Sequence, residues 1–304
     1  MKNRQMTKPQ PVLSFGLQAS VFGLVSAAFT TIYITQPVLP IIQETYQVSA
    51  ARASITISAV VLGITLANLP FGALADRWTI RPIILTGSLI VIGGNIVCAL
   101  TDNFQGLVVA RFIQGLFIPA LTTCLAAFLS RRLPAQRLNV VMGTYVSATV
   151  AGGLGGRLLG GLFHPAFNWR WAFVIAAGLL AIACGIAWRW LPREETTGPR
   201  QSAQLSFWQL LAQAPLRHNY LVAFSAFFVF SSVFNYLPFY LAAPPFSAPT
   251  RTITLMYLAY LIGIVMGPLA GQMSNRFGNG RTMAGAVSYT HLTLPTTIPS
   301  CGCG

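Results

Sequence analysis

The sequence predicts an all-α membrane protein, and three observations carry that prediction. Of the 304 residues, 54% are hydrophobic and only 8% are charged, whereas an ordinary soluble domain has about 25% charged residues. Apolar stretches of about 20 residues, the length that crosses a bilayer, recur along most of the chain. Short segments rich in charge, proline or glycine separate these stretches, which indicates helices joined by tight loops.

Eight spans and the beginning of a ninth follow from this pattern. We place them at 12–38, 53–75, 82–101, 104–129, 138–163, 169–191, 216–243 and 252–274, with the ninth beginning at 281. Residues 1–191 then form an N-terminal six-helix bundle, a polar segment at 192–215 is the expected cytoplasmic linker, and 216–286 begin a second bundle. From residue 287 to 304 the chain resembles translated adapter sequence, so we expect a non-native tail there.

Basic residues predict the orientation. The formal net charge is +14, and most of the 19 Lys and Arg residues fall in segments expected on one side, whereas the opposite loops hold Arg52, Arg170 and Arg251. Because basic residues collect on the cytoplasmic side, we expect a multi-pass protein of the bacterial inner membrane with a cytoplasmic N-terminus. These bases are scattered singly, and a nucleic-acid partner would need them clustered. The expected partners are the lipid bilayer and a small-molecule substrate, and we expect a monomer.

A loop with an acid and two bases follows the second span. It contains Gly72, Leu74, Asp76, Arg77 and Arg81. A glycine permits close helix contact, and an acid near a helix end can pair across an interface and hold one conformation. The pattern recurs 199 residues later, after the eighth span, at Gly271, Asn275, Arg276, Gly278 and Arg281. A motif repeated after an equivalent span indicates two related halves.

These two loops resemble the signature loop of the major facilitator superfamily. The resemblance implies two six-helix bundles with inverted repeats, of which this chain would hold about eight and a half of twelve transmembrane helices. Two departures from the family pattern suggest a weaker gating loop. Thr79 and Ile80 stand where the family has glycine and a base, and Asn275 replaces the acid in the second copy.

Two arginines lie inside predicted spans. Arg111 is in the fourth span with Gln114 and Gly115, a spacing similar to the superfamily's fourth-helix motif, which is implicated in proton coupling of exporters. An arginine at the bilayer centre costs about 2.5–3.5 kcal/mol on insertion scales, so Arg111 must avoid lipid. Two hypotheses remain: Arg111 faces a wet cavity, or it is bound to backbone carbonyls and holds the bundle together.

Arg157 is the second of these charges, and it lies among the glycines of the fifth span. Gly152, Gly153, Gly156 and Gly160 form small-residue pairs that predict close helix packing. The glycine richness resembles the superfamily's antiporter motif on this helix, but the proline of that motif is absent.

Four polar residues are candidates for a substrate cavity. Tyr33 and Gln36 lie at the end of the first span, in a Gln-Pro-x-Leu-Pro ending that resembles arabinose-efflux-type permeases of the drug/proton antiporter branch, and Asn235 and Tyr236 lie in the seventh span. The alternative for the first pair is a proline-bent helix end whose polar groups satisfy the backbone.

The function expected from the resemblance is proton-coupled efflux of drugs, sugars or metabolites by alternating access. The proton gradient would supply the energy, and no cofactor or metal is indicated. No Asp or Glu lies within an apolar span, so we expect a coupling acid elsewhere in the protein or a neutral or anionic substrate. The alternative is an importer of an organic anion held by Arg111 or Arg157. An enzyme is disfavoured because His164, His218 and His291 have no acidic partners in the sequence pattern.

Overall fold

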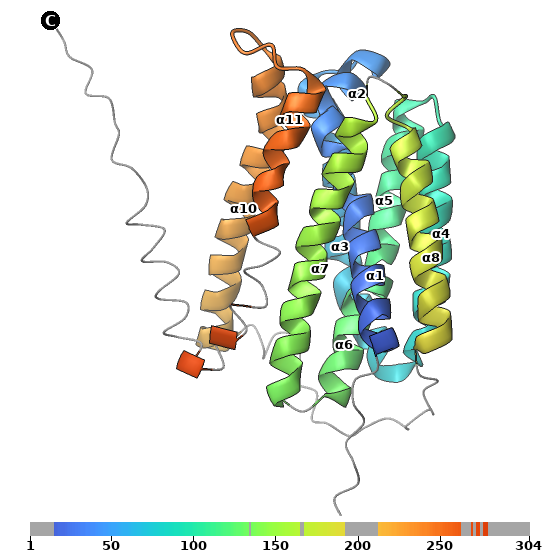
Figure 1. Ribbon diagram of the computed structural model, residues 1–304, viewed down its shortest axis with the longest axis vertical. Helices are drawn as coiled ribbons and strands as arrows, with labels where there is room; N and C mark the ends of the chain where they lie inside the picture. The colour runs from blue at the N-terminus through green and yellow to red at the C-terminus, as the bar shows by residue number, and fades with distance from the viewer. Residues whose placement is uncertain are drawn as a thin grey trace, which may run out of the picture.

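A computed structural model describes residues 15–133, 135–164, 167–191 and 212–262, together with 269, 272–273 and 276–278. Near-parallel helices run along the long axis of the molecule (Figure 1). They are α1 (Phe15–Tyr33), the 3₁₀ turn η1 (Gln36–Val38), α2 (Leu39–Tyr46), α3 (Ala50–Arg77), α4 (Ile80–Leu100), α5 (Phe104–Leu121), α6 (Thr123–Arg132), α7 (Ala135–Leu162), α8 (Trp171–Trp190), α10 (Ala214–Ala242), α11 (Thr250–Met256) and the 3₁₀ turn η2 (Tyr257–Ala259). Most of the expected linker and the whole of the expected tail lie outside the described residues.

Six helical segments in the described part of the chain are long and apolar enough to cross a membrane. They are Gly16–Tyr46, Ala50–Arg77, Ile80–Leu100, Phe104–Arg131, Trp171–Trp190 and Leu216–Ala242. Helix α7 has 28 residues but is not among them, because its glycines and Arg157 lower its hydropathy. Six of the predicted spans thus coincide with membrane-length helices, and the fifth coincides with α7.

Prolines interrupt two of the spans that the sequence predicts as continuous. The first helix ends at Tyr33, and the chain continues through η1 and α2 to Tyr46 instead of ending near residue 38. The fourth span divides at Thr122 into α5 and α6. Pro119, in the last turn of α5, has no N–H to donate to the carbonyl of Gly115, so the helix is weakened where it divides.

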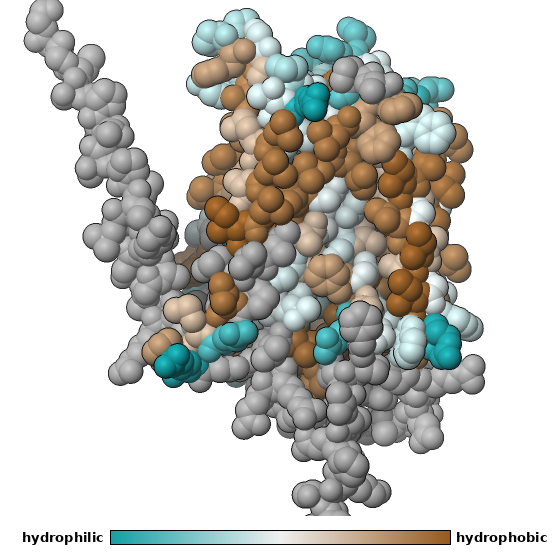
Figure 2. Space-filling model, in the orientation of Figure 1, coloured by the Kyte–Doolittle hydropathy of each residue, from teal (hydrophilic) through white to brown (hydrophobic). Residues whose placement is uncertain are grey.

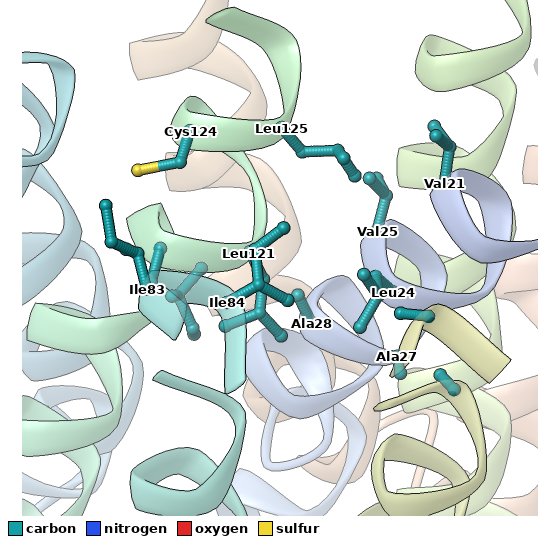
Figure 3. Packing of buried hydrophobic residues seen from close by; sticks show 14 of the residues in the cluster. Val21, Leu24, Val25, Ala27, Ala28, Ile83, Ile84, Leu121, Cys124 and Leu125 are labelled. Carbon is teal, nitrogen blue, oxygen red and sulfur yellow. The ribbon is translucent and has the colours of Figure 1, made fainter. Parts of the chain in front are cut away.

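Helices α1 to α8 pack together in one bundle, called the first bundle below, which is built on two closely packed helix pairs. The most extensive contacts are those of α3 with α5 and of α1 with α7, and α4 and α8 pack alongside. Apolar side chains of α1, α4, α5 and α6 interdigitate in the core (Figure 3). On another side of these helices, α11 packs against α7, and α10 packs against α11, η1 and α2 (Figure 1).

The outer surface is apolar along the middle of the helices. Brown, hydrophobic side chains cover most of the described surface between the two ends (Figure 2), and large exposed ones include Leu66, Leu69, Leu89 and Ile182. A soluble monomer rarely exposes so large a continuous apolar surface. Apolar side chains thus fill the interior and also cover the outer surface of the helices, which is the pattern of a protein embedded in a lipid bilayer.

Candidate functional site

Two cavities lie between the first bundle and α10. The larger has a volume of about 740 Å³ and is lined by residues of α1, η1, α3, α5 and α10. The smaller, of about 410 Å³, is lined by residues of α1, α7, α10 and the segment after η2. Tyr33, Phe227 and Phe230 line both cavities, so the two lie side by side. Both volumes fall in the range of small-molecule sites.

The smaller cavity contains a buried guanidinium. Arg157 is 1% exposed; its Nε donates to Oε1 of Gln36 at 2.6 Å, and its Nη1 donates to the carbonyl of Gly153 at 2.9 Å. Three tyrosine rings surround it, with centroids 4.0 Å from Cζ for Tyr33, 4.6 Å for Tyr260 and 5.1 Å for Tyr257. Such cation–π contacts compensate part of the lost hydration of the arginine. Arg157 is therefore a desolvated cation that the protein holds at a cavity wall.

Gln36 connects this arginine to the other helical group. While its Oε1 accepts from Arg157, its Nε2 donates to Oδ1 of Asn235 at 2.6 Å. Gln36 and Asn235 are separated by 199 residues, the same offset that relates the two signature loops. Both residues line the larger cavity, whereas Tyr236 is 60% exposed and does not line either one. Three of the four predicted cavity residues therefore line the site.

Arg111 occupies a different environment, the interior of the first bundle. It is fully buried and donates to the carbonyls of Thr31 at 2.7 Å, Ile32 at 2.5 Å and Thr56 at 3.2 Å, and to Oε1 of Gln114 at 2.9 Å. Two of these carbonyls belong to the last turn of α1, where a helix leaves its carbonyls without intrahelical partners. Arg111 thus caps α1 and ties it to α3 and α5. It does not line either of the two cavities.

Gln114 extends the Arg111 network. Its Nε2 donates to Oδ1 of Asn95 at 2.9 Å, and Nδ2 of Asn95 is 3.3 Å from Oγ1 of Thr31. Gly115 contributes by its size, because a Cβ there would meet the backbone of Val60 on α3. The predicted trio in the fourth span therefore joins neighbouring helices through polar contacts and close packing.

The glycines of α7 face α1 at a regular spacing. A Cβ built at Gly152, Gly156 or Gly160 would meet the backbone of Ser26, Thr30 or Ile34, respectively. The hydroxyl of Ser26 donates to the carbonyl of Ala148 at 3.0 Å, and that of Thr30 donates to the carbonyl of Gly152 at 3.1 Å. Both series repeat every four residues, so two parallel helices stay in register over two turns.

Gly153 faces away from this ladder. A Cβ there would lie 3.1 Å from Nη1 of Arg157 and 3.4 Å from the ring of Tyr33. The absence of a side chain at this position leaves room for the guanidinium and the tyrosine, and Gly153 itself lines the smaller cavity.

The first signature loop forms contacts within the first bundle. Asp76 pairs with Arg131 of α6, whose Nη1 also donates to the carbonyl of Ala75 at 2.6 Å. Arg81 donates to the carbonyl of Trp188, and its guanidinium lies 4.2 Å from the Trp188 ring centroid. Arg77 is exposed in the last turn of α3.

The close contact expected at Gly72 is not present in the described part of the molecule. A Cβ built there would have no described atom within 4 Å. Leu74 packs against the core. Of the second loop, Gly271, Asn275 and Arg281 lie outside the described residues.

Arg276 and Gly278 of the second loop are described. The guanidinium of Arg276 lies 5.4 Å from the ring centroid of Phe277. Gly278 has a φ of +85°, in the left-handed region that a glycine adopts at the end of a helix.

Four aromatic residues of the site were missed by the sequence analysis: Phe227 and Phe230 of α10, and Tyr257 and Tyr260 beyond α11. Their spacing of three residues in each pair places both members on one helix face. That spacing was the available signal, but lipid-facing aromatics in a membrane helix have the same pattern. Among the described residues, no three His, Cys, Asp or Glu side chains come together as metal ligands.

The fold and the cavities define a multi-pass helical membrane protein with ligand-sized cavities between two helical groups. The chain belongs to the Major Facilitator Superfamily, which its sequence matches over residues 21–297. The match extends past residue 287, so it includes part of the expected tail, whose origin stays a prediction.

Similar proteins carry transporter names. The inner membrane transport protein YnfM of Escherichia coli is 27% identical over 269 residues, covering 87% of this chain and 64% of YnfM. The uncharacterized MFS-type transporter YybF of Bacillus subtilis is 26% identical, covering 84% of this chain and 65% of YybF. The efflux pump dotC of Dothistroma septosporum is 31% identical over 175 residues, which are 56% of this chain and 28% of dotC. The chain thus spans less than two thirds of the length of YnfM and YybF.

Proposed function

We propose that this chain carries the first bundle and part of the second bundle of a secondary transporter that exports small, largely apolar molecules by alternating access, driven by the proton gradient. The observation that supports this function is the larger cavity, which lies between the two helical groups and has mainly apolar walls. A site at the interface of two bundles becomes accessible from either side when one bundle rocks against the other.

The contacts between the two groups suit such a motion. In the described residues, one side-chain hydrogen bond between Gln36 and Asn235 accompanies the contacts of α10 and α11 with η1, α2 and α7. The interior of the first bundle, by contrast, is held by the Arg111 network and the glycine ladder. A rigid first bundle beside a lightly bonded second group is what rocking requires.

Export is supported by the resemblance to exporters and by the name of one relative. The efflux pump dotC covers a little over half of this chain, and Arg111, Gln114 and Gly115 match the spacing of the superfamily's exporter motif. The bacterial inner membrane and a cytoplasmic N-terminus are part of the same proposal, on the basis of the basic residues at one end.

Transport in membrane vesicles tests the proposal. The gene product at the full length of its relatives is expressed in a bacterium that lacks its own drug exporters, and everted vesicles are energised by respiration. The probes are the uncharged dye N-phenyl-1-naphthylamine and radiolabelled 1-naphthylacetate. We expect accumulation of at least one probe, abolished by a protonophore. If no probe accumulates in everted or right-side-out vesicles that contain the folded protein, the proposed transport function is wrong.

A matched pair of variants tests whether the larger cavity is the route. Thr65 lines this cavity, whereas its neighbour Leu66 is 56% exposed on the outer surface. A tryptophan at residue 65 would fill the cavity, so Thr65→Trp should reduce the transport rate at least about fivefold, while Leu66→Trp should leave it within about twofold. Equal rates for the two variants would exclude this cavity as the route.

A second candidate function is import of an organic anion, and the buried guanidinium of Arg157 at the smaller cavity favours it. Uptake of 1-naphthylacetate into right-side-out vesicles, with none into everted vesicles, would replace export with import.

A further inference from the structure

We propose that Arg157 and Tyr260 form a binding subsite for a single carboxylate or sulfonate, and that the adjoining apolar cavity accepts the body of the same molecule. The ligand class is therefore an amphiphilic monoanion. This inference rests on the proposed function, because it names the substrate of the proposed cavity, but it concerns binding and does not depend on the direction of transport.

One edge of the Arg157 guanidinium is unused by the protein. Its Nε and Nη1 donate to Gln36 and Gly153, but Nη2 is buried and has no hydrogen-bond partner among the described residues. An arginine buried without a partner carries a large desolvation cost, so buried arginines are normally paired or fully hydrogen-bonded. The bonds at the other two nitrogens fix the orientation of the guanidinium and leave Nη2 for a ligand.

Tyr260 supplies a second unused donor at the same cavity. Its hydroxyl oxygen is also buried and has no hydrogen-bond partner in the described part of the chain, its ring centroid is 4.6 Å from Cζ of Arg157, and both residues line the smaller cavity. The neighbouring Tyr257 differs, because its hydroxyl lies 3.3 Å from the carbonyl of Phe234 and bonds to it. Two donors and one positive charge match the acceptor oxygens of one carboxylate.

The charge balance around Arg157 leaves one unit to be neutralised. None of the described residues that line the two cavities is acidic. Asp76 and Asp102 pair with Arg131 and Arg170 at the ends of the bundle. Glu44 is exposed on α2. One uncompensated cation suits a monoanion, whereas a phosphate dianion would bring a second charge into an apolar site without a partner.

The larger cavity determines the rest of the ligand. It shares Tyr33, Phe227 and Phe230 with the smaller cavity, so a molecule whose acid group reaches Arg157 extends its body along these rings. The remaining walls are mostly aliphatic side chains of α3 and α5, with Ser58, Thr65 and Ser231 as hydroxyl groups. An aromatic or branched aliphatic body of drug-like size meets these walls better than a sugar, which would need many more polar partners.

Binding of two matched probes tests the subsite. The purified protein in lipid nanodiscs is titrated by calorimetry with 1-naphthylacetate and with 2-(1-naphthyl)ethanol, which has the same aromatic body but no charge. We expect the acid to bind about tenfold more tightly than the alcohol, because a charge-assisted hydrogen bond contributes more than a neutral one. Equal affinities for the two probes would overturn the proposal.

Variants of Arg157 and Tyr260 test whether these two donors cause the preference for the acid over the alcohol. Arg157→Gln should bring the acid-to-alcohol ratio close to one, and Tyr260→Phe, which removes only a hydroxyl, should lower it about threefold. Arg52→Gln and Tyr46→Phe are the matched controls, because neither residue lines the two cavities, and both should keep the wild-type ratio. If Arg157→Gln does not fold, as judged by its melting curve, the Tyr260→Phe ratio decides; an unchanged ratio in Tyr260→Phe would contradict the two-donor site.

Failure of this inference is distinguishable from failure of the proposed function. Protonophore-sensitive transport without a preference for the acid in binding removes the subsite and leaves the transporter. Selective binding of the acid, with the preference lowered in Tyr260→Phe, without transport in either vesicle orientation supports the subsite and removes the transport function.

Discussion

The packing of α7 against α1 leads to a quantitative prediction at Gly156. A Cβ built at this residue has the backbone of Thr30 as its three nearest atoms, with the carbonyl carbon and Cα both at 3.0 Å and the oxygen closer still. Backbone atoms cannot rotate aside as a side chain would. Gly156→Ala therefore has to separate the two helices or tilt one of them.

The cost follows from two opposing contributions. Extra methylene volume in a well-packed core costs about 1–3 kcal/mol, whereas replacing glycine by alanine inside a helix gains about 0.5–1 kcal/mol. Gly178→Ala on α8 is the matched control, because a Cβ there has no described atom within 4 Å and the residue is exposed. In Gly178→Ala the free energy of unfolding changes only by the helix contribution. The difference in the free energy of unfolding between the two variants therefore gives the packing cost of about 1–3 kcal/mol.

Thermal unfolding in detergent, followed by circular dichroism at a fixed heating rate, measures this difference. With about 2–4 °C per kcal/mol, Gly156→Ala should melt roughly 2–12 °C below Gly178→Ala. The loss should be accompanied by faster hydrogen exchange in α1, since the backbone of Thr30 is displaced. Equal melting temperatures for the two variants would refute the close approach of α1 and α7.

Two further predictions concern the other charged residues. Arg111→Lys keeps the positive charge but should lower the free energy of unfolding by about 2 kcal/mol, because one ammonium cannot reach the four acceptors that the planar guanidinium bonds. A melting temperature equal to that of the wild type would show that the charge alone suffices. Asp76→Asn should cost at most about 1 kcal/mol, because the side chains of Arg131 and Asp76 are 37% and 50% exposed and surface ion pairs contribute little. A larger loss in the same melting assay would mean that the loop stabilises the bundle more than its exposure suggests.

The sequence predicts that Arg111 does not face lipid. It does not predict which groups Arg111 binds, because those groups lie far from Arg111 along the chain. Insertion cost excludes lipid and leaves a wet cavity or a carbonyl network as alternatives. The carbonyls that bind Arg111 are free because α1 ends at Tyr33, and the sequence analysis placed that helix end several residues later. The break in α1 therefore determines the geometry of the network, in agreement with the second hypothesis.

The cavity residues divide in the same way. Tyr33 and Gln36 were predicted from the Gln-Pro-x-Leu-Pro ending of the first span, which resembles exporters of one family, and Asn235 was predicted as a polar residue within the seventh span. Phe227, Phe230, Tyr257 and Tyr260 were not, because an aromatic ring is equally suited to lipid, to a core and to a cavity wall. Composition identifies which polar groups need partners, but it contains no signal for which apolar groups surround them.

The sequence by itself determined the all-α class, the approximate spans, the close packing of the glycine-rich helix and the membership of the Major Facilitator Superfamily. These features follow from local composition and periodicity, since a bilayer requires long apolar helices and glycine permits close approach. Only the tertiary structure decided that α7 packs on α1, that Gln36 links Arg157 to Asn235, and that Nη2 of Arg157 and the hydroxyl of Tyr260 have no hydrogen-bond partner among the described residues at a cavity. Those contacts join residues more than a hundred positions apart, and they depend on the rotation and register of whole helices, which no local pattern specifies.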